Sequence, residues 1–324
     1  MNSVPHKSHS AWSLTFGVIG LCFTNASQAH AQAWVPQRGQ GAVTVSYQRI
    51  SNTGHRLSDG FLVEGGQSLN MAAYIEGDYA VTDRLSFTAG LPLVFGKYTD
   101  PNPPPPPIPY LPWDQCHCWQ SGWQDFGLTA RYNVIHAAGG TFALTPSVSA
   151  GVPSHNYEFR GESVQGRHLK EVSLALDAGQ RLDAISPNLS VLGRYSYSFV
   201  ERVLDIPNNR SNATVEGRYM LLRGKLAVRG FALWQRTHGG LRFGSLPPAS
   251  LEVPGEVDTP ERLFQHDRLL RDNNFRAGGG FSYAFPSTDV FASYIYYVSG
   301  TDTHAGGALT LGISWPFEFR GARR

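Results

Sequence analysis

Charged residues and cysteines are few in this chain of 324 residues. Charged side chains make up 16% of the sequence, three residues are Cys, and the formal net charge is only +2. A nucleic-acid-binding protein needs a basic stripe that gains affinity by releasing counterions, and none is visible, so we expect no nucleic-acid partner. With 41% hydrophobic and 12% aromatic residues the chain can bury a large apolar surface, which argues against general disorder.

Long apolar runs are absent after the first thirty-odd residues. Those residues have the order of a secretory signal: basic residues near the start, an apolar stretch over 11–23, and small residues ending at Ala31 and Ala33. A membrane anchor is the weaker alternative, because the stretch is shorter than the roughly 20 residues of a spanning helix. We expect a signal peptide over 1–33, cleaved after Ala31 or Ala33, and a single domain over 34–324.

Segments of alternating character fill the rest of the chain. In the last of them Leu309, Leu311, Ile313 and Trp315 share one face, and small residues occupy the other. This period of two is that of a β-strand. We predict twelve strands, at 41–50, 69–81, 85–97, 123–133, 141–152, 168–181, 188–199, 211–221, 224–236, 273–285, 288–298 and 305–319.

The predicted connections alternate between short and long. The short ones are 82–84, 134–140, 182–187, 222–224 and 286–287, and the long ones are 51–68, 98–122, 153–167, 200–210 and 237–272, with 299–304 brief. Outer-membrane barrels have short periplasmic turns and longer outer loops, and their even strand number puts both termini on one side. We therefore predict an all-β fold: a transmembrane antiparallel β-barrel of about twelve strands in the bacterial outer membrane, with both termini periplasmic.

Ionisable side chains gather on the face opposite the apolar ladders. In a soluble β-protein the apolar face would be buried, whereas in a membrane barrel it meets lipid and the other face lines the interior. The signal peptide and the loop lengths favour the membrane barrel. The candidate lumen-lining residues are then Glu76, Asp125, Arg131, Arg194, Glu216, Arg218, Lys225, Arg229 and Arg276, and Asp78, Glu171, Asp177 and Arg181 share their face.

Three segments resemble strand motifs of the outer-membrane proteins of the meta-pathway phenol-degradation family, which are regarded as transporters. They are Gly122 to Tyr132 (GWQDFGLTARY), Thr145 to Ser154 (TPSVSAGVPS) and Leu309 to Trp315 (LTLGISW). The resemblance extends over the mature chain as a pattern and implies a barrel that admits hydrophobic small molecules. One departure is the tail: such barrels often end on the aromatic residue of the last strand, whereas residues 320–324 follow Phe319 here.

The mixed charges of the predicted inner face allow two interpretations. Opposite charges on neighbouring strands can hold the barrel together, each pair contributing ~0.2–1 kcal/mol. Alternatively, Arg194, Glu216, Arg218 and Arg229 contact a solute in a narrow passage. A ring of one sign would indicate ion selectivity, and the mixture argues against a simple ion-selective porin. A barrel of twelve strands is intermediate between filled and open barrels, and residues 34–40 can help to close its periplasmic mouth.

The long connection 98–122 holds two further features. Its Pro-rich part, 101–112, favours a stiff polyproline II rod that can cover the outer mouth or present a docking surface. Cys116 and Cys118 are the only cysteines after the signal, in a compartment that permits disulfides. They can form a disulfide, remain free thiols, or bind a soft metal with His117 and a histidine from another loop (His55, His155 or His238).

No enzyme signature is present. The sequence contains no Gly-x-Ser-x-Gly, His-Glu-x-x-His or P-loop run, and we expect neither an enzyme nor a bound cofactor or metal. The sequence indicates an outer-membrane channel or uptake protein for small, hydrophobic or aromatic molecules, with lipid and the barrel assembly machinery as its other partners. The alternative is a barrel without transport whose long outer loops bind a partner.

Overall fold

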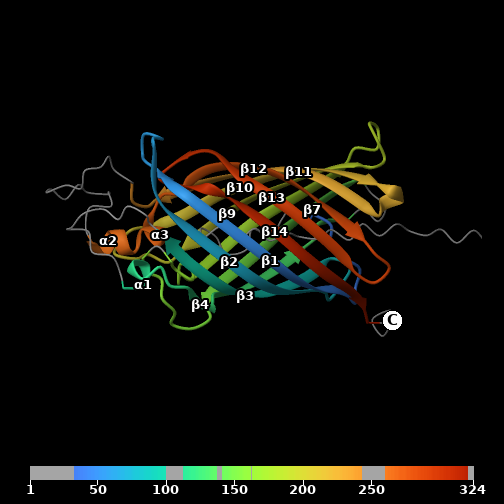
Figure 1. Ribbon diagram of the computed structural model, residues 1–324. Helices are drawn as coiled ribbons and strands as arrows, with labels where there is room; N and C mark the ends of the chain where they lie inside the picture. Colours follow the sequence, from blue (N-terminus) through green and yellow to red (C-terminus); the bar gives the residue numbers. More distant parts are fainter. Residues whose placement is uncertain (1–32, 100–111, 137–140, 162, 243–259, 320–324) are drawn as a thin grey trace, which may run out of the picture.

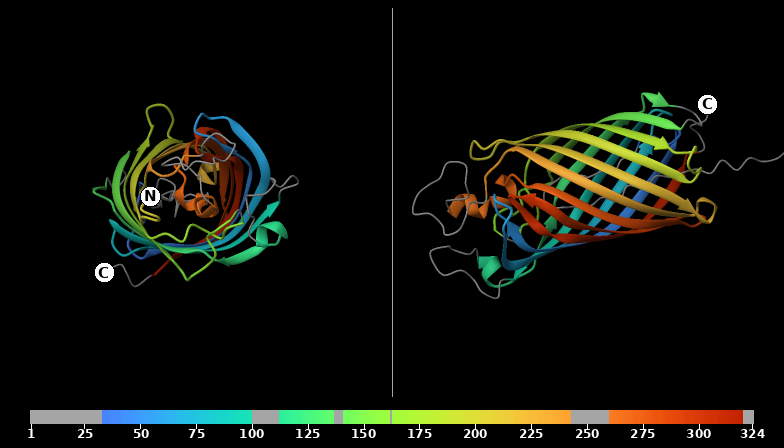
Figure 2. Two further views of the ribbon diagram at one scale, coloured as in Figure 1. Left: turned by 90° about the vertical axis from the view of Figure 1, so that its left-hand side faces the viewer. Right: turned by 90° about the horizontal axis from the view of Figure 1, so that it is seen from above.

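One antiparallel sheet closes on itself to form a barrel in the computed structural model of the chain (Figures 1 and 2). The structure describes residues 33–99, 112–136, 141–161, 163–242 and 260–319. The first strand, β1, pairs with the last strand, β14, over their whole length, from Gln40↔Glu318 to Arg56↔Thr303. This seam removes the free edges that an open sheet would expose, as a lipid environment requires.

The barrel wall has twelve positions. Three short strands share one of them, because β4 and β5 both pair with β3, while β5 and β6 both pair with β7. The strands are β1 (Gln40–Arg56), β2 (Leu62–Ala80), β3 (Leu85–Thr99), β4 (Gln120–Trp123), β5 (Asp125–Tyr132), β6 (Ile135–His136), β7 (Phe142–Pro153), β8 (Glu171–Arg181), β9 (Leu189–Val200), β10 (Asn208–Leu221), β11 (Leu226–Gly239), β12 (Asn273–Ala284), β13 (Asp289–Thr301) and β14 (Thr303–Glu318).

The predicted strand number is confirmed, and most predicted boundaries lie within a few residues of the observed ones. The largest correction concerns 51–68, predicted as a long loop. There β1 continues to Arg56 and β2 begins at Leu62, so the connection is only 57–61. A bulge between Asn52 and Gly54 shifts the register along this extension. Neither face of the extension has to meet lipid, which explains why its sequence lacks the apolar alternation.

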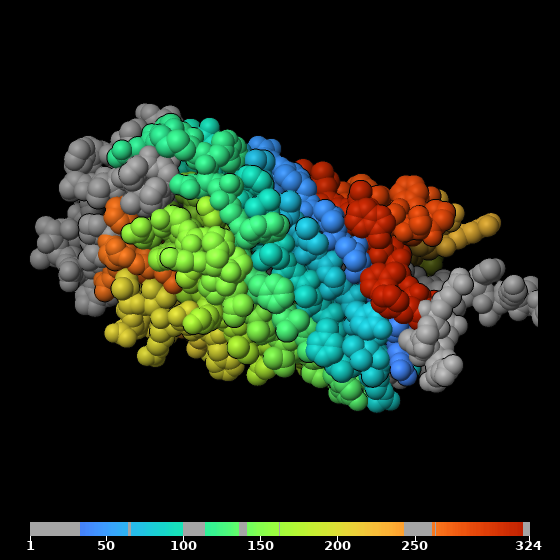
Figure 3. Space-filling view, turned by 90° about the horizontal axis from the view of Figure 1, so that it is seen from below, coloured from blue at the N-terminus to red at the C-terminus, as the bar shows by residue number. Residues whose placement is uncertain are grey.

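Apolar side chains cover the outside of the barrel. Along β14 the exposed residues are Leu309, Leu311, Ile313 and Trp315, while Thr310 and Ser314 between them are buried. The space-filling view shows this outer surface as tilted bands of consecutive strands (Figure 3). The predicted orientation of the two faces is therefore confirmed: the apolar ladders point outward and the polar residues point into the barrel.

Aromatic rings cluster toward both rims of the outer surface. Tyr79, Phe317 and Phe319 pack against one another at the end where the strand β14 finishes. At the other end Trp123, Phe199 and Trp234 are exposed. Such girdles mark the two membrane interfaces in outer-membrane barrels.

The two ends of the barrel differ. Short turns, such as 222–224 between β10 and β11, lie at the end of the C-terminus, which Figure 1 shows opposite the helices. The helices α1 (Pro112–Gln115), α2 (Pro260–Phe264) and α3 (His266–Leu269) lie at the other end, where the longer connections are. By the usual arrangement of such barrels, the helical end is extracellular and the short-turn end periplasmic. No helix in the described parts of the chain is long and apolar enough to span a membrane.

Candidate functional site in the barrel interior

Ion pairs line the inner wall in the periplasmic half of several strands. Arg194 on β9 lies 2.8 Å from a carboxylate oxygen of Asp177 on β8, and both side chains are buried. On β10 the Glu216 carboxylate lies 2.5 Å from Arg218 and 3.8 Å from Arg229 of β11. These residues sit opposite or beside one another on paired strands, so the inward charges largely compensate one another.

A second group joins β2, β3 and β5. The Arg131 guanidinium lies 3.5 Å from Asp78 and donates a hydrogen bond to the Thr88 hydroxyl, which in turn donates to Asp78 at 2.6 Å. Glu76, two residues before Asp78, points to the same side of β2. The Arg131–Asp78 pair and the Thr88 hydroxyl between them fasten the three strands to one another.

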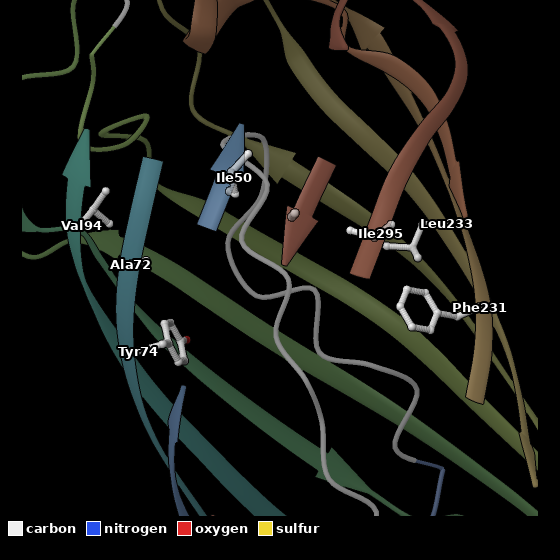
Figure 4. Packing of buried hydrophobic residues seen from close by; sticks show 8 residues of the cluster. Ile50, Ala72, Tyr74, Val94, Phe231, Leu233 and Ile295 are labelled. Carbon is white, nitrogen blue, oxygen red and sulfur yellow. The ribbon is translucent and has the colours of Figure 1, made fainter. Parts of the chain in front are cut away.

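An apolar patch interrupts this polar lining. It consists of inward-facing, buried side chains from one half of the wall: Ile50, Ala72, Tyr74, Val94, Phe231, Leu233, Ile295 and Ala308. Figure 4 shows the labelled side chains of this group directed into the barrel from β1, β2, β3, β11 and β13, and Ala308 belongs to β14. The Tyr74 ring lies over Gly90 of β3, where a Cβ atom would collide with it. We call these eight residues the apolar patch.

The opposite half of the wall has short polar side chains. Buried Ser147, Ser196 and Ser198 point inward from β7 and β9. Hydroxyl pairs connect neighbouring strands there, with Thr129 and Ser149 2.9 Å apart and Ser173 and Ser198 2.6 Å apart. Because these side chains are short, they reach less far toward the barrel axis than the aromatic and aliphatic residues that face them.

Helix α3 lies across the outer mouth. Its contacts reach opposite sides of the wall: the Arg268 carbonyl accepts a hydrogen bond from Asn208 of β10, and the Arg268 guanidinium donates to the His168 carbonyl at 3.1 Å. On the other side, the His266 ring lies 5.5 Å from that of His55 of β1. Looking down the barrel, Figure 2 shows this segment within the ring of strands.

A buried ionic cluster supports the mouth. Asp272, just after α3, lies 3.5 Å from Arg167 and accepts hydrogen bonds from Gln235 and Asn274. Burial alone would raise the pKa of Asp272, but the positive charges of Arg167 and Arg276, together with the hydrogen bond from Thr303 and the nearby His304, hold that pKa below its ordinary value. Arg210 of β10 and Glu171 of β8 form another buried pair nearby.

The N-terminal segment touches the wall at the periplasmic end. The Ala33 carbonyl accepts hydrogen bonds from Asn133 at 3.1 Å and from the Thr145 hydroxyl at 2.6 Å, and Ala33 is fully buried. The Trp34 ring lies so close to Gly179 of β8 that a Cβ atom there would collide with it. Residues 33–35 therefore lie inside the periplasmic mouth, where residues 34–40 were expected to help close it.

The remaining candidates fall in three places. Asp125 lies at the outer end of β5, where it accepts a hydrogen bond from the Tyr157 hydroxyl, and Arg276 is buried near the outer end of β12. Lys225 is exposed next to the turn 222–224, so it lies at the periplasmic rim and not on the inner wall. Arg181 is likewise exposed and pairs with Asp183 in a turn. Arg181 is the last residue of β8 and Lys225 directly precedes β11, so the inward position predicted from the alternation does not hold for either of them.

Cys116 and Cys118 are joined by a disulfide bond just after α1. Their sulfurs are thus not thiolate ligands in this structure, and the Nδ1 atom of His117 lies 3.2 Å from the Tyr98 carbonyl. The Pro-rich segment falls mainly on residues 100–111, which lie outside the described residues, as does the tail 320–324.

Sequence reasoning missed two groups inside the barrel. The apolar patch had a visible signal in β11, where Phe231-Ala232-Leu233-Trp234 is apolar on both faces. The other group is a cluster of His55, His266 and His304 at the outer mouth, whose ligand nitrogens lie within 4.8 Å of one another. His55 and His304 are cross-strand partners on the seam, but nothing in the sequence placed His266 beside them.

Comparisons with known proteins agree with the fold. No protein-family model matches the sequence, and no curated protein matches it. The structure is similar to an outer-membrane channel from Pseudomonas putida F1, with a TM-score of 0.61 and 15% identity over 88% of this chain and 98% of the other. It is more distantly similar to the KdgM porin in complex with oligogalacturonate (TM-score 0.44, 8% identity, 85% and 99% coverage). The TodX monoaromatic hydrocarbon channel also aligns (TM-score 0.42, 10% identity, 90% and 93% coverage). The first of these likenesses shows the fold of an outer-membrane barrel.

Proposed function

We propose that this protein is an outer-membrane channel for small hydrophobic or aromatic molecules. The observation that carries the proposal is the apolar patch inside the barrel, opposite a wall of short hydroxyl side chains. A barrel that only had to be stable could fill this level with paired polar residues, as it does nearer the periplasm. Ligand sites for small molecules are typically apolar with a few polar groups, and the two half-walls supply that combination.

The ion pairs then have a scaffolding role. Arg194, Arg218 and Arg229 each lie near a carboxylate of the wall, so their charge is balanced before any solute enters. This pairing favours the first of the two interpretations of the inner charges and leaves solute contact to the apolar patch. The resemblance to strand motifs of the meta-pathway phenol-degradation family supports a solute of this class.

Segments at both mouths supply the control of passage. Helix α3 contacts opposite sides of the outer mouth, and Ala33 to Val35 lie inside the periplasmic one. A solute crossing the barrel has to pass both, so we propose that they act as gates. In the same proposal residues 1–31 direct export and are removed, and the barrel assembly machinery inserts the chain.

Uptake through vesicles tests the proposal. Full-length mature protein is reconstituted into vesicles with lipopolysaccharide in the outer leaflet, which slows direct permeation of apolar solutes, and entry of phenol is compared with entry of a small sugar. We expect phenol entry to exceed that of protein-free vesicles. Replacing Phe231 and Leu233 by Asn should reduce phenol entry several-fold, while Val215→Ala, on the outer surface of the barrel, should leave it unchanged. Absence of phenol entry through folded wild-type protein would refute transport.

A second candidate function rests on the same mouths. Because the interior charges pair and both ends hold chain segments, the structure also suits a closed barrel whose outer loops bind a partner. Such a barrel would show neither solute entry nor conductance, even with Phe231 and Leu233 intact.

A further inference from the structure

Three histidines from distant parts of the sequence meet at the outer mouth. His55 is the last residue but one of β1, His304 is the second residue of β14, and the two are direct cross-strand partners. His266 is the first residue of α3. The ring centroids of His55 and His304 are 4.5 Å apart, and that of His266 lies 5.5 Å from each of them. One ring nitrogen from each residue lies within 4.8 Å of the other two.

A carboxylate completes the group. An oxygen of Asp267, the residue after His266, lies 3.3 Å from Nε2 of His304 and 3.7 Å from Nε2 of His266. Three imidazoles and one carboxylate are a ligand set that zinc accepts in tetrahedral geometry. Imidazole ligands also suit copper and nickel, whereas magnesium and calcium prefer oxygen. The donors therefore select a borderline transition-metal ion.

Only a modest contraction would bring the donors to binding distance. Zn–N bonds of about 2.0–2.1 Å in a tetrahedron place ligand nitrogens roughly 3.4 Å apart, against the present limit of 4.8 Å. The His55 and His304 rings project from one strand pair, and His266 and Asp267 are on the short helix α3, which residues 270–272 join to β12. Side-chain rotations and a small shift of α3 suffice to close this difference.

The surroundings suit a bound cation. His266 is buried and the His304 and Asp267 side chains are almost so, at 12% and 10% exposure, so bulk water competes little for the donors. Two cations, Arg167 and Arg276, act on His304 electrostatically, but Asp272 lies among them and pairs with Arg167. The hydroxyl of Thr303, the residue before His304, donates a hydrogen bond to the Asp272 carboxylate.

We propose that His55, His266 and His304, with Asp267, bind a divalent transition-metal ion of the zinc class. The ion would join α3 to the β1–β14 seam and so fasten the segment that lies across the outer mouth. Without the ion, α3 keeps its hydrogen bonds to Asn208 and His168, but it is no longer joined to the β1–β14 seam by metal coordination. The proposal holds whether or not the barrel conducts a solute.

Metal binding to the full mature chain tests the proposal directly. The protein is folded in detergent, stripped with a chelator, dialysed, and titrated with Zn²⁺ alone, and bound zinc is counted by elemental analysis after equilibrium dialysis. We expect one zinc ion per barrel. His266→Gln and His304→Gln should each weaken binding by roughly 100-fold or more, since even groups that only orient a ligand typically contribute about 10- to 100-fold. His155→Gln, an exposed histidine of another outer loop, should bind as the wild type does.

Two outcomes overturn the proposal. One is less than stoichiometric zinc on the wild-type barrel, and the other is stoichiometric zinc that both substitutions leave in place. Folding of each variant is checked by its heat-modifiable migration in detergent gels. If the histidine variants do not fold, Co²⁺ added to the wild type still decides, because a tetrahedral nitrogen and oxygen site gives intense visible absorption and surface binding to octahedral sites does not.

Discussion

Arg194 of β9 donates two hydrogen bonds to Asp177 of β8, at 3.1 and 2.8 Å, across the inner wall of the barrel. The Asp177 side chain is fully buried. Removing only one partner would leave the other charge buried without compensation, which lowers the stability of the fold.

Removing one partner of this pair should destabilise the barrel. We expect Asp177→Ala to lower the free energy of unfolding by about 3–5 kcal/mol, because it leaves the Arg194 guanidinium buried without its counter-charge. The measurement is urea unfolding of the barrel in lipid vesicles, followed by tryptophan fluorescence. The control is Asp183→Ala, which breaks the exposed pair with Arg181 and should cost at most about 1 kcal/mol. Equal losses of unfolding free energy in the two variants would contradict a larger contribution of the buried Arg194–Asp177 pair.

Glu216 provides a related test. Its side chain is nearly inaccessible and has two arginines nearby, Arg218 and Arg229. Replacing both arginines by Ala should destabilise the barrel, and adding Glu216→Gln to that variant should restore part of the loss, because the buried carboxylate is then neutral. Unfolding free energies of the three proteins decide the point. A third substitution that lowers stability further would contradict the scaffolding role.

The alternation of lipid-facing residues is what made the strands predictable. Leu309, Leu311 and Ile313 must be apolar because their face meets acyl chains, so twelve strands and both faces follow from the sequence. Beyond the lipid-facing part of a strand the outer face need not be apolar, so the extension of β1 to Arg56 was not predicted. The arrangement of the interior was harder to predict, because inner side chains are selected to contact partners on other strands that are distant in the sequence. The sequence therefore supplied Arg194 and Glu216 as candidates but neither their partners nor the place of His266.

The N-terminal contacts favour one of the two expected cleavage positions. The Ala33 carbonyl accepts hydrogen bonds from Asn133 and Thr145 in the interior of the barrel, which is possible only if Ala33 remains in the mature chain. We therefore expect cleavage after Ala31, with Gln32 as the first mature residue. Intact-mass measurement of protein extracted from outer membranes reads this directly. A mature chain that starts at Trp34 would contradict the role of these hydrogen bonds.

Tyr157 in an outer loop should resist ionisation. Burial, together with the neighbouring Asp125 carboxylate, raises the pKa of the Tyr157 hydroxyl above its ordinary value of about 10. A group with a raised pKa contributes stability that is fully present below its unfolded value and is lost as the pH rises through its folded value. The loop should therefore hold its structure at pH 10 and weaken only at higher pH.

Difference titration checks this expectation. Tyrosinate absorbance of the wild type and of Tyr157→Phe should coincide up to about pH 11, because Tyr157 still holds its proton there. Loss of a group with an ordinary pKa in Tyr157→Phe would mean that the Asp125 contact is not formed.

The membrane location of the barrel depends on which side of the strands meets the bilayer. Nitroxide labels attached to single cysteines at 310 and 311 of the last strand, on a background with Cys116 and Cys118 replaced by Ser, measure this in reconstituted membranes through collision with dissolved oxygen. The account predicts strong oxygen collision for the label at Leu311, which is exposed, and weak collision at Thr310, which is buried. The reverse pattern, or equal collision at both positions, would contradict a lipid-facing apolar surface.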